Sequence, residues 1–163
     1  MKNLTLPLLF TVLAVVFAVP VFAGPQESVE ITVNPTQVSI SLSPASLDFG
    51  SLGLDQESAH GTAVDIENTG TVAVDLDMKG SDAECTTPSA NVWTLSDSDN
   101  GVDTYMLMVS KDSSFGDGDD MYLTTAYAPF YSALSDSGNQ TFRTRITMPS
   151  HTSVYGEHTA RIY

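Results

Sequence analysis

Acidic side chains gather in two segments whose spacing is compatible with cation binding. These carboxylates belong to Asp97, Asp99 and Asp103 in the first segment and to Asp112, Asp117, Asp119 and Asp120 in the second. Oxygen ligands at alternate positions around a glycine can turn toward one ion, as they do in calcium-binding loops. Neither segment has the EF-hand spacing or its final glutamate. The two segments therefore predict weak calcium sites, and the alternative is a pair of solvated acidic loops.

Two arginines, Arg143 and Arg145, lie two residues apart, so they share one face of a predicted strand. The chain has 20 acidic and 6 basic residues, so this pair is a large share of its positive charge. One interpretation is an edge whose charges discourage aggregation. The other is a patch that contacts an acidic surface on a neighbouring subunit. Just before the pair, Asn139 begins an Asn-Gln-Thr sequon, which predicts glycosylation where the source glycosylates exported proteins.

Catalysis has little support in this sequence. The three histidines, His60, His151 and His158, share no metal-ligand spacing, and no Gly-x-Ser-x-Gly elbow occurs. We therefore expect no enzyme. Carbohydrate binding is an alternative function, since sandwich modules often present aromatic side chains that stack on sugars. The candidates for such stacking are Trp93, Tyr122, Tyr127, Phe130 and Tyr131.

The composition excludes several partners. A net charge of −14 repels phosphate backbones and anionic lipid headgroups, so we expect neither nucleic-acid binding nor membrane attachment after export. The single cysteine, Cys85, excludes an intramolecular disulfide framework and a cysteine-rich zinc site. We expect Cys85 to be a buried small hydrophobe, with an intermolecular disulfide as the alternative.

The first 23 residues have the features of a secretory signal peptide. Lys2 precedes a long apolar run, and the run ends in Val21-Phe22-Ala23, with small residues where signal peptidase needs them. A retained transmembrane anchor is the alternative, although Pro20 favours cleavage. The predicted organisation is a signal peptide over 1–23, an N-terminal extension over 24–36 and one domain over 37–163. We expect the protein to be secreted, to the extracellular space or the cell surface.

Alternation of apolar and polar residues dominates the rest of the chain. It predicts strands over 29–33, 38–42, 63–67, 72–78 and 142–148, while the apolar run 105–109 predicts a central strand covered on both faces. Asn68-Thr69-Gly70-Thr71 predicts a hairpin between two of these strands. Residues 121–135 are ambiguous, since 121–123 is compatible with a strand and 129–134 is compatible with one helical turn. The sequence therefore predicts an all-β fold, an antiparallel immunoglobulin-like or jelly-roll β-sandwich of eight or nine strands.

The first of these strands stands apart from the others. Val29, Ile31 and Val33 share one face, and Asn34-Pro35 separates them from the next strand. A strand that leaves its own domain can fill a groove in a neighbouring molecule, where it gains main-chain hydrogen bonds and buries alternate side chains. The alternative is that 28–33 is simply the first strand of its own sandwich.

Two segments carry a family resemblance. Pro44-Ala45-Ser46-Leu47-Asp48-Phe49-Gly50, followed by Glu67-Asn68-Thr69-Gly70, resembles the opening of immunoglobulin-like domains of the ASPM/SPD-2/Hydin type. This resemblance implies a sandwich fold and little about activity. In architecture alone, the chain is loosely similar to secreted fibre subunits of the TasA/camelysin kind and to archaeal pilins, which polymerise by donating an N-terminal strand. The expected function is that of a structural subunit that assembles with copies of itself.

Overall fold

The computed structural model describes residues 30–86, 92–112 and 114–163. The chain divides into two units, residues 1–34 and 35–163. The predicted signal peptide and Val29 lie outside the described residues. Among those that are described, no helix has the length and hydrophobicity needed to cross a membrane.

The described residues form strands and no helices, so the all-β prediction is confirmed. Eleven strands are present instead of eight or nine. They are β1 (Ile40–Ser43), β2 (Glu57–Ala59), β3 (Val64–Asn68), β4 (Val74–Met78), β5 (Ala83–Cys85), β6 (Val92–Ser96), β7 (Thr104–Ser110), β8 (Asp120–Tyr122), β9 (Ala128–Leu134), β10 (Asn139–Thr147) and β11 (His158–Thr159).

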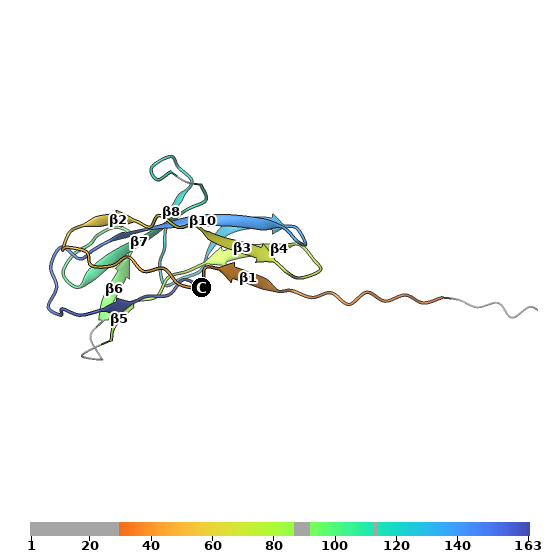
Figure 1. The fold of residues 1–163 in the computed structure, drawn as a ribbon, viewed down its shortest axis with the longest axis horizontal. Coiled ribbons are helices and arrows are strands. Elements are labelled where there is room, and N and C mark those ends of the chain that lie inside the picture. Colours follow the sequence, from red (N-terminus) through yellow and green to blue (C-terminus); the bar gives the residue numbers. More distant parts are fainter. Residues whose placement is uncertain (1–29, 87–91, 113) are drawn as a thin grey trace, which may run out of the picture. The chain divides into compact units, whose positions relative to one another are not determined.

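Most strands belong to one long sheet in the order β1-β3-β10-β7-β6-β5-β11, with β2 beside β10 and β8 beside β7 (Figure 1). The second sheet consists of β4 and β9. One pair departs from the predicted antiparallel arrangement, because β6 and β7 are parallel, with Thr94 opposite Thr104. The reason is local: the acidic loop 97–103 returns the chain to the beginning of β6 before β7 starts.

The predicted hairpin around Asn68-Thr69-Gly70-Thr71 is wrong. β3 pairs with β1 and β10, whereas β4 pairs with β9 in the other sheet. The turn carries the chain from one sheet to the other because the Asn68 amide is fully buried there. Its Nδ2 donates to the carbonyls of Val72 (2.8 Å) and Leu134 (3.0 Å), and its Oδ1 accepts from Gly70 N (3.0 Å).

Two further predictions are settled by strand pairing. The ambiguous segment 129–134 is strand, since β9 pairs along β4. The described part of the predicted strand 29–33, residues 30–33, forms no strand and is exposed. A strand needs a partner for its backbone groups, and alternation alone cannot say whether that partner belongs to the same chain.

The core lies between the two sheets. Tyr105, Leu107 and Val109 of β7 point into it, as predicted for a central strand, and Phe130 of β9 packs edge-to-face on Phe142 of β10 with ring centroids 5.9 Å apart. Burial raises the pKa of Tyr105, whose hydroxyl donates to the Ser81 carbonyl at 2.6 Å. Cys85 is buried in β5, as expected.

Candidate binding cleft

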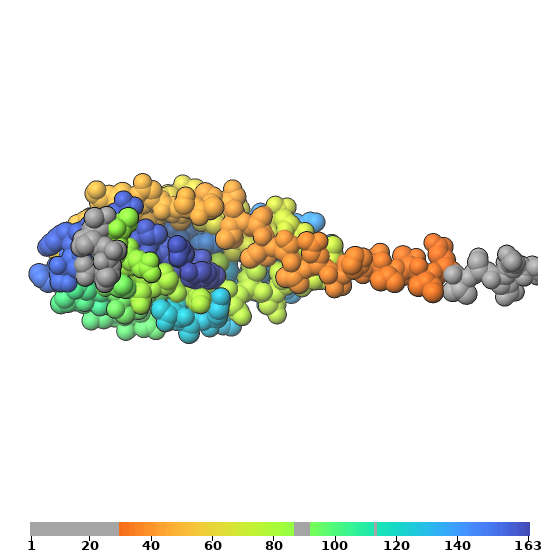
Figure 2. Space-filling model, turned by 90° about the horizontal axis from the view of Figure 1, so that it is seen from below, coloured from red at the N-terminus to blue at the C-terminus, as the bar shows by residue number. Residues whose placement is uncertain are grey.

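A cleft of about 1150 Å³ opens along one side of unit 35–163. One wall is the chain that follows β1, residues 44–52, and the other is the C-terminal segment 156–162. Figure 2 looks onto this side, with the first wall in orange to gold, the second in dark blue, and a hollow between them. The volume exceeds the roughly 300–1000 Å³ that is typical of small-molecule pockets.

The floor of this cleft is the core of the sandwich. It is formed by Val64, Ala83, Trp93, Tyr105, Leu107, Phe142, Thr144, Ile146 and Met148. All but one of these side chains are apolar or aromatic, and Leu47, Ala160 and Ile162 add apolar groups from the walls. Most of these floor side chains are already buried. An occupant with apolar side chains would therefore gain mainly from the burial of its own apolar surface.

The two walls run in opposite directions. Each antiparallel pairing reverses the strand direction. Two such pairings lead from β10 through β3 to β1, so β1 runs in the same direction as β10. Three lead from β10 through β7, β6 and β5 to β11, because β6 and β7 are parallel, so β11 runs in the opposite direction. The first wall is irregular, since Pro44 has no N–H, Gly50 has a φ of 66° and the Asp48 carboxylate accepts from Gly50 N at 2.8 Å. One strand laid in the cleft is therefore parallel to one wall and antiparallel to the other.

One end of the cleft is held by a polar network. Trp93 Nε1 donates to Thr152 Oγ1 at 2.9 Å, and that hydroxyl lies 2.8 Å from Asp103 Oδ1. The Asp103 carboxylate also accepts from the hydroxyl and the amide of Ser153, at 2.5 and 2.7 Å. These hydrogen bonds, from Ser153 first and then from Thr152, lower the pKa of Asp103. The network fixes the indole whose face forms this part of the floor.

The cleft also contains buried polar atoms without a partner in the described part of the chain. They are Thr144 Oγ1 on the floor and His158 Nε2 on the C-terminal wall. Thr144 is only 1% exposed. Because an unpaired buried polar atom costs about 1–3 kcal/mol, these atoms favour an occupant or water that hydrogen-bonds to them.

The N-terminal segment offers the complementary chemistry. Ile31 and Val33 are 83% and 79% exposed. The chain becomes anchored at Gln37, whose N–H donates to Thr71 Oγ1 (2.9 Å) and whose carbonyl accepts from Thr71 N (2.9 Å). Each of the segment's two predicted apolar residues in the described range is thus available for burial against another surface.

The first acidic segment does not gather its carboxylates around one point. Asp103 holds the 152–153 backbone, as described above, whereas Asp97 and Asp99 are exposed. Within residues 30–86, 92–112 and 114–163, no group of three or more His, Cys, Asp or Glu side chains is arranged to hold a metal ion. The calcium site in this loop stays a prediction.

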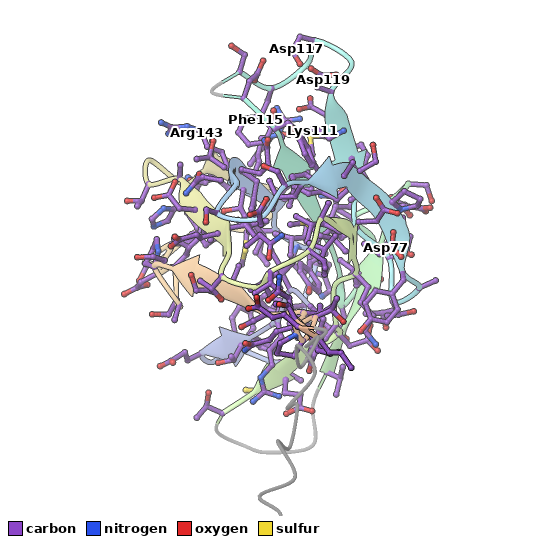
Figure 3. All side chains as sticks on the ribbon, turned by 90° about the vertical axis from the view of Figure 1, so that its right-hand side faces the viewer. Asp77, Lys111, Phe115, Asp117, Asp119 and Arg143 are labelled. Carbon is purple, nitrogen blue, oxygen red and sulfur yellow. The ribbon has the colours of Figure 1, made fainter. Side chains whose placement is uncertain are left out.

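The second acidic segment brings two carboxylates into contact. Figure 3 shows Asp117 and Asp119 at the end of the loop between β7 and β8. Asp112 Oδ1 accepts from the Ser114 amide at 2.7 Å, which lowers the pKa of Asp112, while lost hydration and the neighbouring Asp112 carboxyl raise the pKa of Asp117. Asp120 Oδ2 accepts from Gly116 N. Calcium binding here also stays a prediction.

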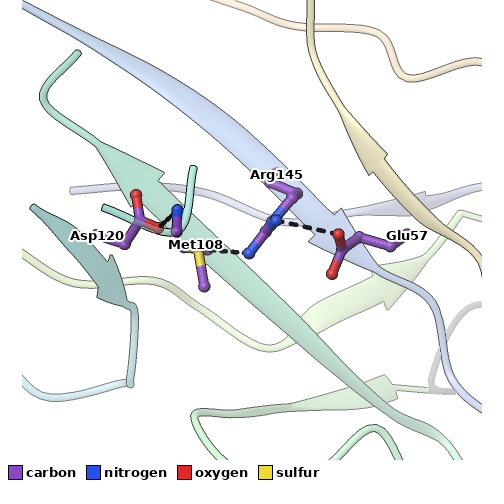
Figure 4. A network of polar contacts seen from close by, with 5 residues as sticks. Glu57, Met108, Asp120 and Arg145 are labelled. Atoms are coloured by element: carbon purple, nitrogen blue, oxygen red, sulfur yellow. Dashed lines mark hydrogen bonds and ion pairs between the residues drawn. The ribbon is translucent and has the colours of Figure 1, made fainter. Parts of the chain in front are cut away.

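Both arginines are engaged within their own chain. Arg145 Nη1 forms an ion pair with Glu57 at 3.0 Å, and its Nη2 donates to Met108 Sδ at 3.0 Å (Figure 4). Arg143 Nη1 donates to the Gly61 carbonyl at 2.6 Å. A contact with another subunit would compete with these bonds, and it stays a prediction.

The remaining predicted residues lie apart from the cleft, with one exception. Trp93 is in the cleft floor and Phe130 is in the core, so neither presents a free ring face at the surface, while Tyr122, Tyr127 and Tyr131 are exposed. Carbohydrate binding through the three exposed tyrosine rings stays a prediction. Asn139 is exposed at the beginning of β10.

Sequence reasoning did not find the cleft itself. Its walls are 44–52, where the sequence shows a family motif, and the C-terminal segment 156–162. Residues that far apart become the walls of one cleft through strand order, which alternation does not encode.

Comparison with known proteins adds no relative. No family model matches the chain, and neither a curated protein nor a solved structure is significantly similar to it.

Proposed function

We propose that the protein is a secreted structural subunit that assembles with copies of itself into an extracellular fibre or surface layer. Each copy donates residues 29–33 as a β-strand, which enters the cleft of the next copy. The observation that carries this proposal is the cleft between 44–52 and 156–162, with its apolar floor. The predicted signal peptide supports an extracellular location.

The side chains of the N-terminal segment 29–33, which we call the tail, are suited to such a cleft. Val29, Ile31 and Val33 would face the floor, while Glu30 and Thr32 would face solvent, because side chains alternate along a strand. Burying each apolar side chain contributes about 1.5–3 kcal/mol, and the added strand gains main-chain hydrogen bonds.

Chain length favours a neighbour's cleft over the subunit's own. From its anchor at Gln37 the chain advances through β1 into the first wall. If the tail turns back along the first wall, it covers at most about 3.3–3.6 Å per residue. An extended strand in the wall advances by the same distance per residue, so each tail residue passes at most one wall residue. Val33 therefore reaches no farther than the level of Ser41, and Val29 no farther than that of Ala45. In its own chain, this segment would cover only the beginning of the cleft.

Paired substitutions in the tail test the proposal. Ile31→Asp places a charge on the face that enters the cleft, whereas Thr32→Asp places the same charge on the opposite face one residue away. We expect purified Thr32→Asp to form filaments or sheets in negative-stain micrographs, and Ile31→Asp to stay monomeric, since each interface is weakened at least roughly tenfold.

Both variants should melt at the same temperature as monomers, because Ile31 and Thr32 are exposed. Assembly of Ile31→Asp at the wild-type concentration dependence would contradict the proposal.

A further inference from the structure

The C-terminal wall of the cleft has a free backbone edge. The Glu157 carbonyl accepts from Thr86 N, the Arg161 carbonyl accepts from Ser81 N, and Tyr163 exchanges two bonds with Lys79. These alternate residues therefore direct their backbone groups toward β5 and the chain before it. Those of His158, Ala160 and Ile162 are directed to the opposite side.

That opposite side faces the cleft, because β11 is the last strand in the order of the long sheet and the whole segment 156–162 lines the cleft. The other wall lacks such a regular series of groups, since Pro44 has no N–H and the turn at Asp48–Gly50 interrupts it. The edge to which an incoming strand can pair is thus 158–162.

The ring of His158 marks one end of this edge. It stacks on Trp93, with ring centroids 3.6 Å apart and planes 13° apart. Its Nδ1 lies 3.1 Å from the Gly156 carbonyl, and Nε2 is buried without a partner in the described residues. Cys85 lies opposite it in β5, and its chain neighbours are Glu157 and Thr159. A carboxylate that enters from the cleft side would give Nε2 a hydrogen-bond partner.

The chain just before the tail contains one such group. Once this segment forms a strand, period-two alternation would place Glu27 on the same face as Val29, Ile31 and Val33. From Glu27 to Val33, it is the one polar member of that row.

Building on the proposed function, we propose that the donated strand runs parallel to 156–162 and places Glu27 at His158. With the alternation kept, Val29 then lies beside Ala160 and Ile31 beside Ile162. In the reverse direction Val33 would lie at His158, which would leave Nε2 without a hydrogen-bond partner.

Disulfide trapping between outward-facing residues distinguishes the parallel from the antiparallel direction of the donated strand. It leaves the strand's cleft-facing side chains unchanged. In a Cys85→Ala background, Thr159→Cys is combined with either Ser28→Cys or Thr32→Cys. Neighbouring strands place paired residues at a separation that a disulfide can bridge. We expect covalent multimers on non-reducing gels from the 28/159 pair under mild oxidation, and at least roughly tenfold less from the 32/159 pair.

Each other result has a definite meaning. Trapping through 32/159 instead would overturn the parallel direction. Filaments that form without either crosslink would overturn pairing at 158–162 while leaving self-assembly intact. Absence of assembly in the Cys85→Ala parent and in the wild-type protein would refute the proposed function itself. Glu27→Ala should reduce the ratio of 28/159 to 32/159 crosslinking roughly tenfold, and an unchanged ratio would remove the role of Glu27.

Discussion

Buried polar groups differ in their hydrogen bonding between the β4–β9 side of the sandwich and the cleft. Where β4 and β9 cover the long sheet, the buried Asn68 amide reaches the carbonyls of Val72, Leu134 and Ser135 and accepts from Gly70 N. At the cleft, Thr144 Oγ1 and His158 Nε2 are buried without a partner in the described residues. The β4–β9 side is complete within one chain, whereas the cleft side has the properties of a surface that a second molecule completes.

The same contrast separates the edges of the two sides. Residues 37–39, which lead into β1, are held by the 69–71 turn through Ser39 O and Gln37 O. A Cβ on Gly70 would collide with the Gln37 carbonyl, so only glycine allows this close approach. Across the cleft, His158, Ala160 and Ile162 direct their backbone groups toward open space. Order on the β4–β9 side therefore sets the position from which the tail leaves.

The largest effect is expected from breaking the complete side. Asn68→Ala would remove the side-chain donor to the buried carbonyls of Val72 and Leu134, whereas the Ser135 carbonyl keeps its bond from Gly138 N and the Gly70 amide keeps its bond to Ser39 O. We therefore expect the unfolding free energy to fall by about 2–4 kcal/mol. Urea denaturation of Asn68→Ala in the assembly-deficient Ile31→Asp background measures this loss of unfolding free energy. A loss below about 1 kcal/mol would show that the Asn68 bonds are replaced by water.

Ala160→Pro tests the free edge. Proline at this position removes an N–H that is directed toward the cleft and leaves every hydrogen bond to β5 in place. Edge strands tolerate proline at such positions. We expect the monomer to keep its melting temperature within a few degrees and assembly to be lost in sedimentation or micrographs.

Two companions sharpen this test. Ala160→Ser keeps the N–H and should assemble, whereas Arg161→Pro removes an N–H that donates to Ser81 Oγ at 3.0 Å and should destabilise the monomer. Normal filaments from Ala160→Pro would argue against pairing at this edge.

The Asp103 network gives a pH dependence at the end of the cleft. Hydrogen bonds lower the pKa of this carboxyl in the folded protein. Its contribution to stability is therefore present above the unfolded pKa of about 4 and is lost as pH falls through the folded value. We expect Asp103→Asn to lower the melting temperature at neutral pH, with the difference from wild type shrinking below about pH 4. Asp97→Asn, in the same loop, is the control; a difference that persists at pH 3 would contradict this assignment.

The smallest effect is expected from Thr144→Val. This substitution removes an unpaired hydroxyl while keeping the shape of the side chain, so the monomer should be unchanged or more stable by up to about 1 kcal/mol. A clear loss of monomer stability would show that Thr144 Oγ1 already has a partner, such as ordered water. Chemical denaturation in the Ile31→Asp background gives the answer.

The sequence by itself determined the fold class and the faces of the strands. Alternation of apolar and polar residues places Val64 and Ile66 inside and Asp65 and Glu67 outside, because side chains point to opposite faces with a period of two. The same rule predicts a strand over 29–33, whereas residues 30–33 form no strand and their side chains Ile31 and Val33 are exposed.

Tertiary structure decided which strands pair and what they leave open. Asn68 sends the chain from one sheet to the other instead of forming a hairpin, and the loop 97–103 makes β6 and β7 parallel. The first outcome depends on a partner distant in sequence, the Leu134 carbonyl, and the second on the path of the loop; alternation of apolar and polar residues carries no information about either. The cleft is the clearest case: residues 44–52 follow β1 and residues 156–162 contain β11, and these two strands lie at opposite ends of the strand order, with five strands between them.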